Sequence, residues 1–207
     1  MRTLFWVRVA AWSVAVIAAV VVVVITTGVL DRGPSGTNAG TNAGTSVGSV
    51  GGPFTLIGTD GQTVTEADFA GRPRAMFFGF THCPDVCPTT LAEADGWLKA
   101  LGPAGDDLRI VFVSVDPERD TPQSMKDYLS AFDPRIVGLT GTPEQIAAVT
   151  KAYRVYARKV DLGDGDYTMD HSAAVLLFDK NGDFAGTVDY RDPQEKAVEK
   201  LKAVVGS

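Results

Sequence analysis

From residue 54 onward, short apolar runs alternate with helix-like patterns, and this alternation restricts the fold more than any other feature of the sequence. Residues 75–80, 110–115 and 136–139 are short, almost continuous apolar runs, which are typical of buried strands. The first run is followed by apolar side chains at helical spacing, namely Leu91, Ala94, Leu98 and Leu101. Strand–helix–strand units of this kind predict a layered α/β fold, with helices covering both faces of a sheet.

Turn and cap signals complete the predicted order of elements. Asp60-Gly61 and Asn181-Gly182 each lie between two short apolar stretches, and both therefore predict β-hairpins. Thr142-Pro143-Glu144-Gln145 combines a cap, a first-turn proline and a capping-box glutamine, so a helix should begin there. A last helix is expected over about residues 193–205, and the hairpins make the predicted sheet a mixed one.

The first 53 residues differ in composition from the rest and are predicted to form an anchor and a tether. Residues 9–30 carry no charge, and as a helix these 22 residues would span about 33 Å, enough for one bilayer crossing. Arg2 and Arg8 come before this stretch and predict that residues 1–8 are cytoplasmic. A cleaved signal peptide is the alternative, but its apolar core is normally only about 7–15 residues long.

Residues 31–53 contain 7 of the 22 glycines and almost no large apolar side chain, so they are predicted to form a flexible linker with a reach of roughly 25 Å. This order places residues 54–207 outside the cytoplasm on a single-pass protein of the cell membrane. Residues 1–53 carry a charge of +2 and the whole chain −6, which leaves −8 on residues 54–207. Because nucleic acid phosphates would repel such a domain, no nucleic acid partner is expected.

The two cysteines of the chain, Cys83 and Cys87, lie where a predicted strand ends and a helix begins. Ligands of α/β sheets are usually bound at such junctions. The free N–H groups and partial positive charge of a helix N-terminus are expected to lower the pKa of a thiol there. One helical turn places the two Cβ atoms about 5–6 Å apart, which permits both metal binding and a disulfide.

A metal site built on these thiols needs at least one further ligand. Zinc would require four ligands, whereas two thiolates and one imidazole suit copper(I), which is a soft ion. The two histidines of the chain are His82 and His171. His82 directly precedes Cys83 and should point away from it, since side chains alternate across an extended segment. His171 precedes a predicted strand and can lie beside the cysteine loop, so we expect it to be the third ligand.

The two neighbours of this histidine have both a chemical and a structural interpretation. Asp170 could accept a hydrogen bond from the His171 imidazole or assist copper(II), and could equally be a solvated loop carboxylate. Met169 offers a soft thioether sulfur, but a methionine beside a strand is more typical of packing.

Residues 116–121 contain several carboxylates, which would suit acid–base catalysis, but a structural role explains them better. Asp120 or Thr121 is expected to cap a helix that begins near Pro122, and Arg119 to be a charge partner.

Three segments together resemble the SCO/SenC family of copper-binding assembly factors for cytochrome c oxidase. These are residues 78–88, 115–122 and 170–172, in this order and at family-like separations, and the resemblance spans roughly residues 53–207. It implies a thioredoxin-like fold with an extra N-terminal β-hairpin and a single membrane anchor. It also implies that copper, as Cu(I) or Cu(II), is bound by Cys83, Cys87 and His171.

The function implied by the resemblance is that of a metallochaperone and not of an enzyme. An extracytoplasmic domain would help to load the dinuclear copper centre of the oxidase's copper-bearing subunit, with other copper chaperones or a thiol reductase as further partners. The alternative is a thiol–disulfide oxidoreductase that uses Cys83 and Cys87 as its redox pair, to reduce the cysteines of that subunit or in redox signalling. Peroxidase activity is a third, weaker hypothesis. His171 distinguishes the first two, because copper needs it and disulfide exchange does not.

Overall fold

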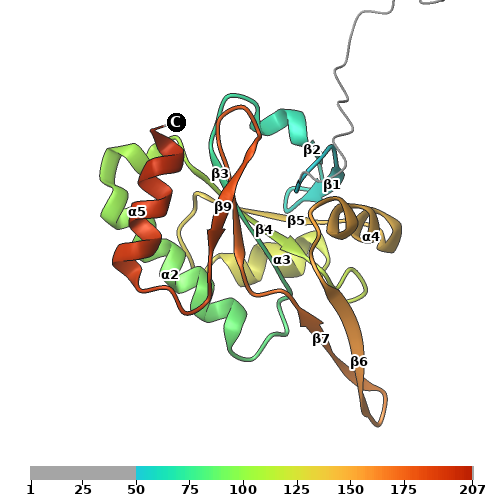
Figure 1. Ribbon diagram of the computed structural model, residues 1–207. Helices are drawn as coiled ribbons and strands as arrows, with labels where there is room; N and C mark the ends of the chain where they lie inside the picture. The colour runs from blue at the N-terminus through green and yellow to red at the C-terminus, as the bar shows by residue number, and fades with distance from the viewer. Residues whose placement is uncertain (1–49, 207) are drawn as a thin grey trace, which may run out of the picture. The chain divides into compact units, whose positions relative to one another are not determined.

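The computed structural model of the protein describes residues 50–206. Strands and α-helices alternate over residues 74–152, as the apolar runs predicted (Figure 1). The strands are β1 (Thr55–Gly58), β2 (Thr63–Thr65), β3 (Arg74–Gly79), β4 (Arg109–Ser114), β5 (Ile136–Thr140), β6 (Ala157–Gly163), β7 (Asp166–His171), β8 (Val175–Phe178) and β9 (Phe184–Val188). The helices are α2 (Val86–Leu101), α3 (Pro122–Leu129), α4 (Pro143–Ala152) and α5 (Gln194–Val205), with the 3-10 turns η2 (Glu66–Phe69) and η3 (Gly102–Asp106).

Within residues 50–206, seven strands form one mixed sheet in the order β2-β1-β5-β4-β3-β8-β9. β4 pairs in parallel with β3 and with β5, while the remaining pairs are antiparallel. Helices flank this sheet, and α2 and α5 lie side by side against it (Figure 1). The mixed α/β architecture and both predicted hairpins, β1–β2 and β8–β9, are therefore confirmed.

The core explains why the sequence patterns predicted these elements. Every residue of β3 is buried, because strands pair with it on both sides and elements cover both of its faces. The buried residues of α2 follow helical spacing and include Leu91, Ala94 and Leu98. The predicted capping box also forms, since the Thr142 side chain accepts from the Gln145 N–H and the Gln145 side chain accepts from the Thr142 N–H.

A separate sheet, made of β6 and β7 in the described part of the chain, was not predicted from the sequence. In Figure 1 this hairpin projects away from the larger sheet. Most of its side chains are exposed or half-buried, so it lacks the apolar run by which the other strands were recognised. Its turn uses positive φ angles at Gly163, Asp164 and Gly165. His171 is the last residue of β7 and therefore belongs to this hairpin.

The predicted cytoplasmic residues 1–8, the anchor over residues 9–30 and most of the linker lie outside the described residues. In the part that the structure does describe, none of the helices has the length and apolarity needed to cross a bilayer.

Candidate metal centre

The two cysteines lie on the segment that connects β3 to α2. Cys83 is half-buried in the loop, and Cys87 lies in the first turn of α2, where it is fully buried. The backbone N–H of Cys87 donates a hydrogen bond to Sγ of Cys83 over 3.4 Å. The Cys83 sulfur thus satisfies one of the N–H groups that have no partner within the helix. The start of α2 holds the two sulfurs together.

Gly79, the last residue of β3, leaves the space that the Cys87 sulfur occupies. A Cβ atom at this position would lie 2.7 Å from Sγ of Cys87 and 2.8 Å from Cε2 of Phe112. Ordinary contacts between such atoms are about 3.5–4.0 Å long. Only glycine therefore allows the buried sulfur to lie against the end of the strand.

Burial controls the protonation of Cys87. The expectation that the helix N-terminus lowers the thiol pKa is wrong for this residue, because burial, with smaller contributions from Cys83 and Asp120, raises the pKa of the Cys87 thiol. Desolvation disfavours the thiolate more strongly than the backbone hydrogen bond at Phe80 favours it. A metal cation supplies the positive charge that the buried thiolate otherwise lacks, so metal binding would replace the proton on this sulfur.

His171 faces the sulfurs from the end of β7. Its Nε2 lies 3.6 Å from Sγ of Cys87, and its Nδ1 lies 3.0 Å from the carbonyl oxygen of Ser172. When Nδ1–H donates to that carbonyl, the lone pair of Nε2 is directed to the sulfurs and free to bind a metal. The rings of Phe77 and Phe80 contact the imidazole edge-on, with centroid separations of 6.2 and 5.7 Å, and hold its orientation.

The structure thus brings together the three residues that the sequence indicated. The donor atoms of Cys83, Cys87 and His171 all lie within 4.8 Å of one another. Two sulfurs and one imidazole nitrogen form a soft donor set that fits copper(I), and they are one ligand short of a structural zinc site. A groove of about 230 Å³ runs along Cys83 and His171, so the donor set is accessible from one side.

The neighbouring candidates have other surroundings. His82 is exposed, and its Nδ1 lies 3.0 Å from Oγ1 of Thr81, as expected for a loop residue. Asp170 is exposed on β7 and lines the groove, but in the described structure the partner of the imidazole Nδ1 is the Ser172 carbonyl instead. Adjacent side chains of a strand point to opposite faces, and the exposed position of Asp170 agrees with its interpretation as a solvated carboxylate. Met169 packs against the core, as its structural interpretation predicted.

Sequence reasoning missed the role of Asp120, which connects the cysteine loop to the loop that follows β4. Thr121 caps α3 by accepting from the N–H of Ser124, as predicted. Asp120 is buried and accepts hydrogen bonds from N and Oγ1 of Thr81, at 3.0 and 2.6 Å, and from Oγ of Ser114, at 2.6 Å. The carboxylate is thus a buried acceptor that fixes the start of the cysteine loop. Thr81 lies 39 positions from Asp120 in the sequence, so local pattern could not reveal this contact.

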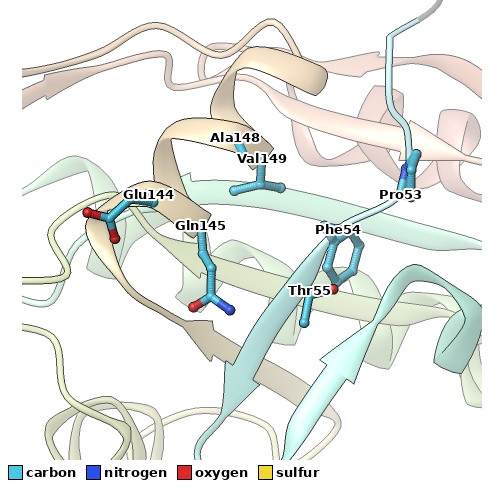
Figure 2. A pocket seen from close by; sticks show the side chains of 7 residues that line it. All are labelled: Pro53, Phe54, Thr55, Glu144, Gln145, Ala148 and Val149. Carbon is cyan, nitrogen blue, oxygen red and sulfur yellow. The ribbon is translucent and has the colours of Figure 1, made fainter.

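A larger hollow of about 360 Å³ lies between β1 and α4 (Figure 2). Its lining combines one carboxylate with mostly apolar and neutral side chains, namely Pro53, Phe54, Thr55, Glu144, Gln145, Ala148 and Val149. This lining contains neither a cysteine nor a histidine. Cys83 and His171, which could bind a metal, line the smaller groove instead.

The fold and the donor set together define a soft-metal site at the end of a strand on a thioredoxin-like scaffold. The chain belongs to the SCO1/SenC family, whose model matches residues 42–206. Protein SenC of Rhodobacter capsulatus is 40% identical over 184 residues, which cover 87% of this chain and 82% of SenC. The mitochondrial SCO1 homolog 1 of Arabidopsis thaliana is 44% identical over 137 residues, which cover 66% of this chain but only 41% of that relative.

Solved structures share the same fold. ScoI of Bradyrhizobium japonicum, determined with copper bound, is 49% identical with a TM-score of 0.71, and the match covers 75% of this chain and 99% of ScoI. BsSco, a member of the Sco family of cytochrome c oxidase assembly proteins, has the fold at 24% identity and a TM-score of 0.61, covering 76% of this chain and 94% of BsSco.

Proposed function

We propose that this chain is a copper metallochaperone that binds one copper ion through Cys83, Cys87 and His171 and delivers it to the copper-bearing subunit of cytochrome c oxidase. The observation that carries this proposal is the convergence of donors from two distant segments to within 4.8 Å, although Cys87 and His171 are 84 positions apart in the sequence. The 49% identical ScoI, whose structure holds copper, supports the choice of metal.

The unequal burial of the ligands suits delivery of the ion. Cys83 and His171 line the groove, whereas Cys87 is fully buried behind them. An incoming thiolate would therefore reach the copper from the groove and displace Cys83 or His171 before Cys87. With only three ligands, the ion has room for this additional donor during exchange. Cys87 would then hold the copper until the last exchange.

We further propose that residues 9–30 anchor the chain in the cell membrane, with the copper-binding domain outside the cytoplasm. The uncharged 22-residue stretch and the arginines before it support this topology. The linker would let the domain move toward a membrane-bound oxidase subunit.

Copper titration of the full-length chain, reduced and in detergent, tests the ligand assignment. The wild type should bind one Cu(I) per chain in competition with a chromogenic chelator. His171→Ala should weaken binding by more than about 100-fold, beyond the cost of losing a residue that only supports a ligand. His82→Ala is the matched control and should bind like the wild type. Equal affinity in His171→Ala would show that the assignment is wrong.

A second candidate function, thiol–disulfide reduction, is favoured by the different exposure of the two sulfurs. Half-buried Cys83 can attack a partner disulfide, forming a mixed disulfide and releasing one partner thiolate. Attack by Cys87 on Cys83 then releases the second partner thiolate and leaves a Cys83–Cys87 disulfide, a two-electron transfer to the partner. If this is the function, His171→Ala should retain it while losing copper.

A further inference from the structure

The metal ligands come from two pieces of the fold that do not share a sheet. Cys83 and Cys87 belong to the β3–α2 segment, whereas His171 ends the β6–β7 hairpin. Figure 1 shows this hairpin extending away from the larger sheet. The position of the imidazole relative to the sulfurs therefore depends on the contacts that dock the hairpin.

One closed cycle of side chains provides a large part of this docking. The guanidinium of Arg119 lies 3.7 Å from the ring centroid of Tyr167, and its Nη1 donates to the Tyr167 carbonyl over 3.0 Å. Nε of Arg119 donates to Oδ2 of Asp116, and the Tyr167 hydroxyl donates to Oδ1 of the same carboxylate over 2.8 Å. Burial and the Asp116 hydrogen bond raise the pKa of Tyr167 to about 12, so its hydroxyl stays protonated as a donor.

The cycle connects directly to both halves of the metal site. Tyr167 precedes His171 by four residues on β7, so the two side chains lie on the same face of the strand. The guanidinium of Arg119 also lies 5.8 Å from the ring centroid of Phe80, one of the two aromatic rings that contact His171 edge-on. The neighbouring Asp120 fixes the cysteine loop through Thr81. The loop after β4 thus holds the hairpin through Arg119 and the cysteine loop through Asp120.

We propose that Arg119 is a positioning residue for copper binding: by clamping Tyr167 against Asp116, it holds the β6–β7 hairpin where the His171 imidazole meets the two sulfurs. This inference rests on the proposed copper site. A planar guanidinium can stack on the ring and donate to two acceptors at once, which a lysine ammonium cannot do in this geometry. Copper binding should therefore depend on Arg119, while chemistry confined to the two sulfurs should not.

Cu(I) competition titration and thiol–disulfide equilibrium, measured on the full-length chain, test this dependence. Arg119→Gln should lower the Cu(I) affinity by about 10–100-fold, as loss of a group supporting a ligand does. The equilibrium constant of the Cys83–Cys87 disulfide against glutathione should change far less than the copper affinity, because the hairpin contacts the sulfur pair only through the His171 imidazole beside Cys87. Tyr167→Phe keeps the stacked ring and loses one hydrogen bond, so it should show a smaller loss of affinity, and it serves as the test if Arg119→Gln fails to fold.

The matched control is Arg72→Gln, the same substitution at an exposed arginine just before β3. Arg72 takes no part in the contacts between Arg119, Tyr167 and Asp116. Substitutions at exposed positions of this kind cost little stability, so copper affinity should stay within about twofold of the wild type. Unchanged affinity in Arg119→Gln overturns the proposal. A parallel shift of the disulfide equilibrium also overturns it, because Arg119 would then support the whole fold.

Hydrogen exchange of the metal-free protein separates this inference from the proposed function. Arg119→Gln should speed the exchange of β7 amides by at least about tenfold while α2 amides keep wild-type rates. If the β7 amides of Arg119→Gln exchange at wild-type rates, the positioning role is overturned, whatever the protein binds. A wild type that binds no copper refutes the proposed function alone, and the exchange result then decides whether Arg119 positions the hairpin.

Discussion

Replacing Gly79 with alanine should damage the copper site and the fold together. The added Cβ would lie 2.7 Å from Sγ of Cys87 and 2.8 Å from Phe112, so one of these buried groups must move by about 1 Å to reach ordinary contact. Overpacking of this kind costs about 1–3 kcal/mol of unfolding free energy. For a domain of this size that corresponds to a fall in Tm of about 2–12 °C.

Gly79→Ala should affect copper binding more strongly than it affects the stability of the fold. Metal–ligand distances tolerate deviations of only about 0.2 Å, which is far less than the displacement of the sulfur. We expect Gly79→Ala to lower Cu(I) affinity by at least about tenfold, within the range seen when the support of a ligand is disturbed. Thermal unfolding by circular dichroism and chelator competition measure the two effects on the same sample.

Gly96→Ala is the matched control for this experiment. Gly96 lies within α2, and the nearest atom to an added Cβ is 3.7 Å away, an ordinary contact. Alanine should stabilise the helix by up to about 1 kcal/mol and leave copper affinity unchanged. If Gly79→Ala keeps the wild-type Tm and copper affinity, the close approach of Cys87 to the strand is not a constraint and the reasoning fails.

Two further predictions concern stability in acid and topology. Hydrogen bonds from Arg135 lower the pKa of Asp133 to about 2, below its unfolded value near 3.9. The ion pair therefore stabilises the protein above about pH 4 and is lost as the pH falls toward 2. Asp133→Asn should lower the unfolding free energy at pH 7, measured by urea titration, and should flatten the decline of that free energy between about pH 4 and 2. Parallel plots of unfolding free energy against pH for the variant and the wild type would refute this. Alkaline phosphatase fused after residue 207 should be active in a bacterial host, and become inactive when residues 9–30 are deleted; activity without them would contradict the anchor.

Local patterns in the sequence predicted the parts of the fold that are buried on both sides or capped by adjacent residues. β3 and β4 were visible as apolar runs because nearly all of their side chains lie in the core. The start of α4 could be predicted because Thr142 and Gln145, three positions apart, form reciprocal hydrogen bonds between side chain and backbone. Such signals lie within a few residues of the element that they define.

The parts that could not be predicted depend on contacts between distant segments. β6 and β7 have no continuous apolar run, and the Arg119–Tyr167 contact that docks them joins residues 48 positions apart. Asp120 suggested a local helix cap, while its carboxylate binds Thr81, 39 positions away. For the ligand set, the residues themselves indicated Cys83, Cys87 and His171 and the family resemblance implied the same set, but the Cys87–His171 approach required the folded chain.

X-ray absorption of the copper-loaded full-length protein tests the central claim most directly, because it counts the sulfur and nitrogen ligands of the ion. We predict two sulfurs and one imidazole nitrogen per copper in the wild type, and loss of the imidazole signal in His171→Ala. A wild-type site made of sulfur alone, or an imidazole signal that persists without His171, would contradict the convergence of Cys83, Cys87 and His171 on one ion.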